Sequence, residues 1–359
     1  MGNKVAPKGS ASGGKRKPLP FERDSLGYIS ERSVLALENL YNHVPEPGSE
    51  PCPSKVPAYR RAAVLLGLFV GRNGELYVIL SKRSSHLRSH GGDTAIPGGR
   101  FEPTDRDLEF TARREAYEET GLPIDYQRTI KLCELQPFLS ANELVVTPFV
   151  VLLTDKQVQP HLNPREVDSL FSLPFSSFLH HHPPQEMRSS LRLTSDPSLE
   201  KLKAQMSEVM HPSDWHSCRD ILWLGGSRIR RHTFYDERNP IRGLTSDILI
   251  HASSLAYGQA PTFVLEAPGQ PSQARLIELA FNSPLRIQRF RVKPRMSFLL
   301  QHATGQASSS VMGDNLQQPV DEDSNFRLAP PPHPASTGLD QSQEVEGEDR
   351  QSKTSKSKL

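Results

Sequence analysis

Three glutamates stand close together in the segment at residues 98–122, GGRFEPTDRDLEFTARREAYEETGL. If the segment is a helix that ends at Gly121, then Glu115, Glu118 and Glu119 share one helix face, because positions i, i+3 and i+4 are neighbours. Like charges four residues apart cost an isolated helix roughly 0.2–0.5 kcal/mol. A hard divalent cation such as Mg²⁺ would offset that cost, because it prefers carboxylate and water oxygens. The spacing therefore indicates a metal site.

A simpler interpretation is a solvated acidic face. Arg114 and Glu118 stand four residues apart and could form a surface ion pair. The surroundings favour the metal site instead. Residues 97–99 are Pro-Gly-Gly, a turn whose backbone can approach a ligand closely. The small side chains of Ala112 and Ala116 would let the helix pack closely on a sheet.

The segment from Gly99 to Leu122 resembles the Nudix box, whose pattern is GxxxxxE, seven residues, then REUxEExGU, where U is aliphatic. The second half matches from Arg114 onward. In the first half, Asp105 stands where the pattern has glutamate, and eight residues rather than seven precede Arg114. Asp105 and Asp107 both remain candidates for the early acidic position.

Residues 83–99, RSSHLRSHGGDTAIPGG, resemble the additional signature of coenzyme A diphosphatases, with Ile96 in place of a phenylalanine. Arg83 and Arg88 in this glycine-containing stretch would suit bidentate recognition of phosphate. The alternative is a basic surface loop without a ligand. Further segments that resemble these diphosphatases are residues 147–150, 163–167 and 241–245.

The resemblance implies an α+β fold, an α/β/α sandwich with a mixed sheet and the box helix. It implies Mg²⁺ or Mn²⁺ held by Glu115, Glu118 and Glu119, with the Gly99 carbonyl as a further ligand. The same carboxylates could supply the general base, and Glu166 is the candidate from outside the box.

The activity that the resemblance implies is hydrolysis of the coenzyme A diphosphate to adenosine 3′,5′-bisphosphate and 4′-phosphopantetheine. Acyl esters of coenzyme A are further candidate substrates. Two alternatives stay open. The substrate could be another nucleoside diphosphate compound, such as ADP-ribose or a dinucleotide, or the protein could be an inactive Nudix scaffold that binds coenzyme A or a partner.

Hydrophobic runs predict the strands that would position the site. Asn73-Gly74 is a strong hairpin signal between two of them. Pro148 is expected to interrupt one run. The expected strands are residues 61–70, 76–80, 131–135 and 145–153, with a further candidate at 275–281.

Composition divides the chain of 359 residues into three parts. Residues 1–25 are predicted to be a disordered basic arm, residues 26–301 a Nudix hydrolase domain, and residues 302–359 a disordered polar tail. Residues 183–232, which include Trp215 and Trp223, are predicted to be an insertion. A net charge of +2 argues against a dedicated nucleic-acid binder.

Other features bear on location. The three cysteines are scattered and suit a reducing compartment. No apolar run is long enough to predict a membrane span.

The run at residues 180–182, three histidines before two prolines, is expected to be a solvated turn. The final residues Ser357, Lys358 and Leu359 match the peroxisomal address, so we expect an import receptor as partner and the peroxisome as location.

Overall fold

Alternate side chains of strand β1 (Arg61–Val70) face two different helical layers. Ala63 and Leu65 pack beneath helix α2 (Leu108–Thr120), whereas Leu66 and Leu68 belong to a larger cluster on the opposite side. Successive residues of a strand point to opposite faces of a sheet, and β1 is apolar on both faces because both are covered.

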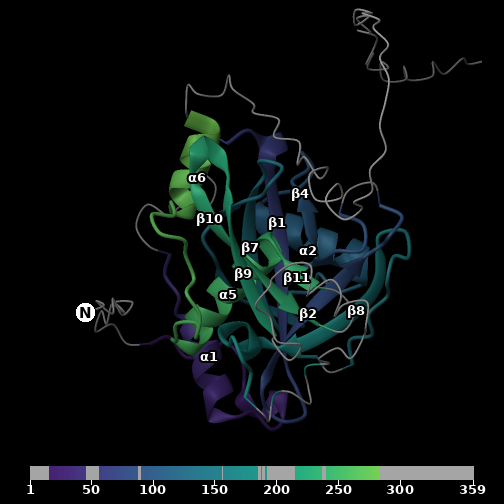
Figure 1. Ribbon diagram of the computed structural model, residues 1–359. Helices are drawn as coiled ribbons and strands as arrows, with labels where there is room; N and C mark the ends of the chain where they lie inside the picture. The colour runs from purple at the N-terminus through teal and green to yellow at the C-terminus, as the bar shows by residue number, and fades with distance from the viewer. Residues whose placement is uncertain are drawn as a thin grey trace, which may run out of the picture. The chain divides into compact units, whose positions relative to one another are not determined.

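Figure 1 shows the computed structural model, which describes residues 16–45, 56–87, 90–155, 157–184, 187, 191, 215–236 and 240–282. These residues all belong to one compact unit, residues 1–291. A second unit, residues 292–359, lies outside the described residues, as do the predicted tail and Ser357, Lys358 and Leu359.

The main sheet has eight strands, in the order β3-β2-β1-β7-β5, with β4 also paired to β1, β6 to β7 and β8 to β2. Strands β1 and β7 run parallel, and every other strand pair among the described residues is antiparallel, so the sheet is mixed, as predicted. The remaining strands of this sheet are β2 (Leu76–Arg83), β3 (Thr94–Ala95), β4 (Gly98–Arg100), β5 (Thr129–Glu134), β6 (Phe138–Leu139), β7 (Val145–Leu153) and β8 (Val167–Pro174).

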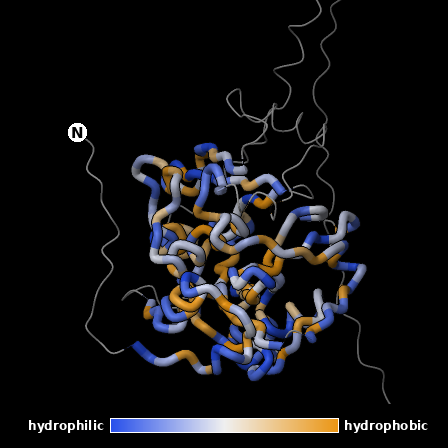
Figure 2. Tube along the Cα trace, turned by 90° about the horizontal axis from the view of Figure 1, so that it is seen from below, coloured by the Kyte–Doolittle hydropathy of each residue, from blue (hydrophilic) through white to orange (hydrophobic). Residues whose placement is uncertain are grey.

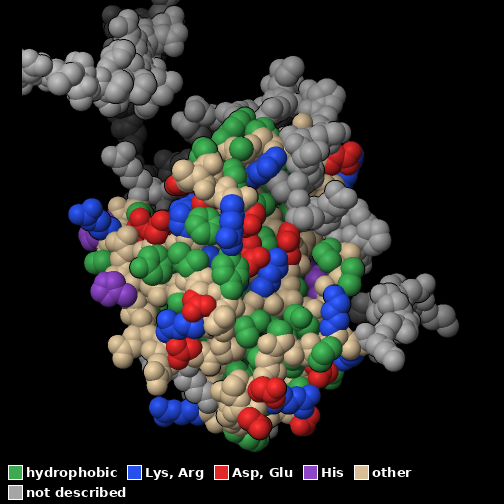
Figure 3. All heavy atoms as spheres, turned by 180° about the vertical axis from the view of Figure 1, so that it is seen from behind, with side chains coloured by type: hydrophobic (Ala, Val, Ile, Leu, Met, Phe, Trp, Pro, Cys, Tyr) green, Lys and Arg blue, Asp and Glu red, His purple; other side chains and the backbone are tan. Residues whose placement is uncertain are grey.

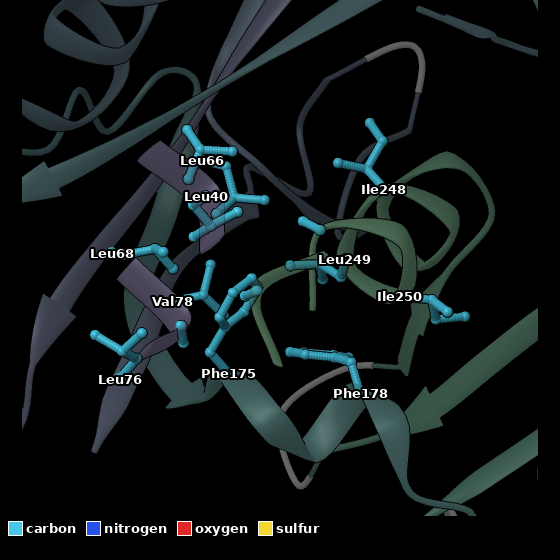
Figure 4. Close-up of a cluster of buried hydrophobic side chains, with 14 of the residues drawn as sticks. Leu40, Leu66, Leu68, Leu76, Val78, Phe175, Phe178, Ile248, Leu249 and Ile250 are labelled. Carbon is cyan, nitrogen blue, oxygen red and sulfur yellow. The ribbon is translucent and has the colours of Figure 1, made fainter. Parts of the chain in front are cut away.

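Helices cover both faces of this sheet, which confirms the predicted sandwich. Helix α2 lies on one face, and α1 (Glu31–Tyr41) and α5 (Leu244–Tyr257) pack together on the other (Figure 1). Figure 4 shows part of the larger cluster, where Leu66 and Val78 of the sheet meet Leu249 of α5. In Figure 2 the hydrophobic segments run mainly through the interior of the trace. No helix in the described part of the chain is long and apolar enough to cross a membrane.

The 3-10 helices in the described part of the chain are short. Single turns of 3-10 helix precede α1 and β1 and follow β8 and β9. They are η1 (Arg23–Leu26), η2 (Ala58–Arg60), η3 (Phe175–Leu179) and η4 (Leu224–Gly226).

The strands predicted at 61–70 and 145–153 are confirmed at those bounds, and Pro148 does not interrupt β7. Pro148 lies within the parallel pairing of β7 with β1, opposite Val64, and the register of β5 against β7 shifts between Lys131 and Cys133. The strand proposed at 275–281 is wrong, because helix α6 (Gln273–Asn282) occupies it. Its buried residues Leu276, Ile277 and Ala280 follow helical spacing.

The predicted insertion contributes to the core. Strands β9 (His216–Leu222) and β10 (Arg228–Tyr235) form a hairpin, and β11 (Pro240–Arg242) pairs with β10 in a second, three-stranded sheet. The Trp215 side chain just before β9 is fully buried, and its indole N–H donates to the Ser177 carbonyl at 3.0 Å.

The expectation of a solvated turn at the three histidines is wrong for His181. Its Nδ1 lies 3.0 Å from Nδ1 of His216, whose Nε2 lies 2.9 Å from Nδ1 of His232. His232 Nε2 lies 2.8 Å from the Leu265 carbonyl, which can only accept, so each ring along this chain donates toward Leu265. Burial, together with the neighbouring histidines, lowers the pKa of His216 to about 2.

Candidate active site

The box helix α2 is fixed at both ends by residues of the motif. Asp107 caps its start, where its carboxylate accepts the Phe110 N–H at 2.7 Å. At its end Gly121 adopts a left-handed conformation with φ of 71°, and its N–H donates to the Tyr117 carbonyl at 2.8 Å. The predicted helix end at Gly121 is therefore confirmed.

Asp105, one of the two aspartates considered for the early acidic position, is buried against Arg114. Its buried carboxylate accepts two hydrogen bonds from Arg114, from Nε at 2.8 Å and from Nη2 at 3.0 Å, and another from the Thr111 hydroxyl at 2.8 Å. Burial would raise the pKa of Asp105, but these bonds hold it below its usual value. This bidentate pair ties the loop before α2 to the helix.

Glu115 packs directly against the backbone of Gly99. In β4, Gly99 pairs with Ala63 of β1, and a Cβ at position 99 would collide with the Glu115 carboxylate. Only glycine therefore allows this approach. Burial raises the pKa of Glu115; Arg114 acts in the opposite direction. The predicted ligands Gly99 and Glu115 are thus adjacent.

Glu119 is the most buried of the three box glutamates, with 6% of its side chain exposed. One carboxylate oxygen accepts a hydrogen bond from Arg83 Nη1 at 3.4 Å, and the other accepts the Gly98 N–H at 3.2 Å. The pKa of Glu119 is raised to about 7, mainly by burial. Arg83 and the Gly98 N–H act to lower this pKa, and the charges of Glu115 and Glu166 act to raise it.

Glu166 is held beside the box by the loop before β8. The Ser84 N–H donates to the Glu166 carbonyl at 2.8 Å, and the Asn163 N–H donates to the Glu119 carbonyl at 3.0 Å. The Glu166 charge raises the pKa of both Glu115 and Glu119. The fold therefore places this candidate near both glutamates, although it lies far from the box in sequence.

Glu118 is the most exposed of the three box glutamates. Its side chain is 51% exposed and pairs with Arg114 Nη1 at 3.2 Å. For Glu118, the surface ion pair considered from the sequence is therefore what the structure shows. Arg88, the second predicted phosphate ligand, lies outside the described residues.

Arg83 stands at the neck of the loop that precedes the box. Its N–H donates to the Asp93 carbonyl at 2.9 Å, and its carbonyl accepts the Gly92 N–H at 3.0 Å. Arg242 of β11 pairs with the Asp93 carboxylate at 3.0 Å, and His90 contacts the same carboxylate at 3.2 Å. Sequence reasoning assigned no role to Arg242, because a contact across 149 residues leaves no local signal.

The chemistry of these side chains fits a hard divalent cation. The site is partly buried, and the charge of Glu166 raises the pKa of both Glu115 and Glu119, while Arg83 lowers that of Glu119. Within the described ranges, no group of three or more His, Cys, Asp or Glu side chains is already arranged to hold a metal ion. Charges of both signs lie beside one another on the face drawn in Figure 3.

Comparison with known proteins agrees with this geometry. Residues 58–193 match the model of the NUDIX domain. The chain is 36% identical over 213 residues to "Nudix hydrolase 15, mitochondrial" of Arabidopsis thaliana, covering 58% of this chain and 63% of that one.

Two relatives carry a more specific name. Over 186 residues the chain is 33% identical to the peroxisomal coenzyme A diphosphatase 1 of Saccharomyces cerevisiae, covering 44% of this chain and 55% of the relative. Over 111 residues it is 37% identical to a peroxisomal coenzyme A diphosphatase of Mus musculus, covering 31% and 46%. The chain thus spans less than two thirds of the length of these relatives.

A crystal structure of a MutT/nudix family protein from Enterococcus faecalis overlaps 65% of this chain and 64% of its own, with 13% identity and a TM-score of 0.30. The assignment rests on the domain match and on the box residues described above, from Gly99 to Leu122. The chain therefore contains a Nudix domain at residues 58–193, as the resemblance predicted.

Proposed function

We propose that this chain is a hydrolase that cleaves the diphosphate of coenzyme A into adenosine 3′,5′-bisphosphate and 4′-phosphopantetheine. One observation carries the proposal: Glu115, Glu119 and Glu166 gather opposite Arg83, at the neck of the loop with the coenzyme A diphosphatase signature. The names of the yeast and mouse relatives support this substrate.

The metal in this proposal is Mg²⁺ or Mn²⁺. Glu115 and Glu119 would hold it together with the Gly99 carbonyl, and Glu118 would join them after leaving Arg114. Bound there, a divalent cation polarises a diphosphate and lowers the pKa of a coordinated water.

The protein's own groups complete the chemistry. Glu166 lies outside the helix but next to its carboxylates, and it is our candidate for accepting the proton of the attacking water. Arg83 is 28% exposed and presents a guanidinium fork that matches phosphate geometry. The hydrogen bond from Arg83 to Glu119 is long, at 3.4 Å. Arg83 can therefore give up this bond for one to a substrate phosphate at little cost.

The direct test is product analysis of purified protein incubated with coenzyme A and either metal. Appearance of both predicted products supports the proposal, whereas no cleavage of coenzyme A would refute it. A panel with ADP-ribose and a dinucleotide separates the alternative substrates. Binding of coenzyme A without turnover of any compound would support the inactive scaffold.

Arg83 gives a sharper test of substrate recognition. Losing a charge-assisted hydrogen bond costs about 1.5–3 kcal/mol, so Arg83→Ala should lower kcat/KM for coenzyme A by roughly one to two decades. Arg83→Lys should recover only part of this. Arg275→Ala, which removes an exposed arginine from α6, is the matched control and should leave kcat/KM unchanged.

Arg83→Ala and Arg88→Ala should also be compared on 3′-dephospho-coenzyme A. Replacing the arginine that binds the 3′-phosphate should lower kcat/KM less for 3′-dephospho-coenzyme A than for coenzyme A. Equal losses on both substrates would show that neither arginine recognises the 3′-phosphate.

We also propose a peroxisomal location, on the names of the yeast and mouse relatives, although two Arabidopsis relatives are named mitochondrial and chloroplastic. A fluorescent protein fused to the N-terminus should appear in peroxisomes. Deleting residues 357–359 should release it to the cytosol, and a diffuse signal from the intact fusion would contradict this location.

A further inference from the structure

Asp93 makes contacts with both its backbone and its side chain at the end of the loop that precedes the box. Its carbonyl accepts the Arg83 N–H at 2.9 Å, and its own N–H donates to the His90 carbonyl at 3.2 Å. One carboxylate oxygen accepts a hydrogen bond from Arg242 Nη2 at 3.0 Å, and the other lies 3.2 Å from Nδ1 of His90. Asp93 therefore connects the backbone of Arg83 to a residue of the second sheet.

The conformation of His90 needs these contacts. His90 has a φ of 57°, in the left-handed region that residues other than glycine seldom adopt. Such a conformation persists where the surroundings fix it. Burial would raise the pKa of Asp93, but the bonds to Arg242 and His90 hold it below its usual value. Asp93 is therefore charged at neutral pH, the form that binds Arg242 most strongly.

Arg242 is held by a rigid part of the second sheet. Strand β11 pairs with β10, and Ile241, the residue before Arg242, is fully buried. Gly243, with φ of 66°, then leads the chain directly into α5. At the start of this helix the Thr245 hydroxyl donates to the Thr94 carbonyl at 3.3 Å. Residues from β11 and α5 thus contact two successive residues at the end of the loop.

Arg83 stands where its own strand holds the backbone less firmly. The pairing of β2 with β8 shifts in register between Lys82 and Arg83. Irregularities of this kind redirect a side chain and are common beside active sites. On the loop side, the Arg83 backbone is held by the Asp93 carbonyl and by the Gly92 N–H, which donates to the Arg83 carbonyl at 3.0 Å. The direction of the Arg83 guanidinium therefore depends on the end of the loop as well as on β2.

We propose that Arg242 is a positioning residue for substrate recognition. Through Asp93 it fixes the backbone of Arg83, so that the Arg83 guanidinium meets a substrate phosphate in the required orientation. This inference rests on the proposed function. It gives the second sheet, part of which the sequence marked as an insertion, an effect on substrate affinity without a contact to the substrate.

The effect on the loop can be measured without substrate or metal. Hydrogen exchange in a folded protein proceeds through local opening, and the N–H groups of Arg83, Gly92 and Asp93 all donate within this part of the loop. Removing an exposed ion pair changes such an equilibrium by up to about fivefold. Arg242→Ala should therefore speed exchange at these three amides by about two- to fivefold, with the amides of β1 unchanged.

Two variants serve as controls for the exchange measurement. Only one nitrogen of Arg242 bonds to Asp93, so the point charge of lysine can replace it, and Arg242→Lys should restore most of the protection. Arg230→Ala removes a bidentate pair with Asp220 inside the same sheet. Arg230→Ala should leave exchange in the loop as in the wild type.

Kinetics with coenzyme A and Mg²⁺ test the effect on recognition. Arg242→Ala should raise KM by about two- to fivefold and leave kcat unchanged, because the box carboxylates stay in place. Asp93→Ala, which removes the carboxylate and keeps the backbone bonds, should have at least the same effect on KM. If Arg242 acts through Asp93, then adding Arg242→Ala to Asp93→Ala should change KM no further.

Faster loop exchange in Arg242→Ala, a raised KM with unchanged kcat, and no added effect in the double variant would support the inference. Unchanged exchange in Arg242→Ala, a fall in kcat at unchanged KM, or effects that multiply in the double variant would overturn it. The last result would mean that Arg242 contacts the substrate directly. Failure of the proposed function would show separately, as no cleavage of coenzyme A by the wild type. The exchange measurement would still establish whether Arg242 holds this part of the loop.

Discussion

Replacing Glu119 with glutamine should stabilise the metal-free protein while removing its activity. Burial raises the pKa of Glu119 from 4.5 to about 7. A carboxyl group whose pKa is raised by folding destabilises the fold progressively as the pH rises from its unfolded pKa to its folded pKa. The penalty is absent below pH 4.5 and complete above pH 7, where it is about 3 kcal/mol.

Glutamine removes most of that penalty. Its carbonyl oxygen can still accept the Gly98 N–H, but its amide cannot accept a bond from Arg83, so part of the gain is lost. We expect a net stabilisation of about 1–3 kcal/mol at pH 8. This is a rise in Tm of about 2–4 °C per kcal/mol for a domain of this size, and it should be negligible at pH 4.5.

The assay is thermal unfolding at pH 4.5 and pH 8, with a chelator and then with Mg²⁺ or Mn²⁺. Saturating metal should stabilise the wild type by about 2.7 kcal/mol at a hundredfold excess over Kd, but should do so only weakly in Glu119→Gln. Glu118→Gln is the matched control: its carboxylate is 51% exposed, so metal-free stability should hold. A Glu119→Gln protein that is destabilised at pH 8 yet still stabilised by metal would refute this reasoning.

Three further predictions address neighbouring features. Gly99→Ala should displace the Glu115 carboxylate and lower kcat for coenzyme A by at least tenfold, with circular dichroism near wild type. Asp105→Asn should weaken the anchor of Arg114 and destabilise the fold by about 1–3 kcal/mol in urea unfolding, since asparagine carries no charge and offers one acceptor oxygen where the carboxylate offers two. The pKa of His216 is about 2 in the folded protein, so below pH 6.5 the unfolded chain takes up a proton that the folded protein does not. The stability that His216 contributes above pH 6.5 is therefore lost as the pH falls below 6.5. His216→Gln should therefore lose about 1 kcal/mol less stability than the wild type between pH 6.5 and 5.5. An equal loss in both proteins would contradict a neutral, buried His216 ring.

Several local features of this protein can be predicted from its sequence. Hydrophobic runs gave β1 and β7 at their observed bounds, because strands covered on both faces are continuous apolar segments. The spacing of Glu115 and Glu119 and the terminating Gly121 were sufficient to predict the box helix and its end. These signals are readable because helix and strand periodicity and the left-handed conformation of glycine act over a few residues.

Which of these groups come into contact depends on how the chain packs in three dimensions. All three box glutamates share a helix face by spacing, yet Glu119 is buried beside Arg83 and Glu118 is paired with Arg114 in solvent, because only one edge of that face lies against the sheet. Likewise, the contact between Arg242 and Asp93 depends on how a second sheet packs beside the first. Contacts between distant segments, and the burial that shifts a pKa, are set by packing of the whole core, which no short window of sequence records.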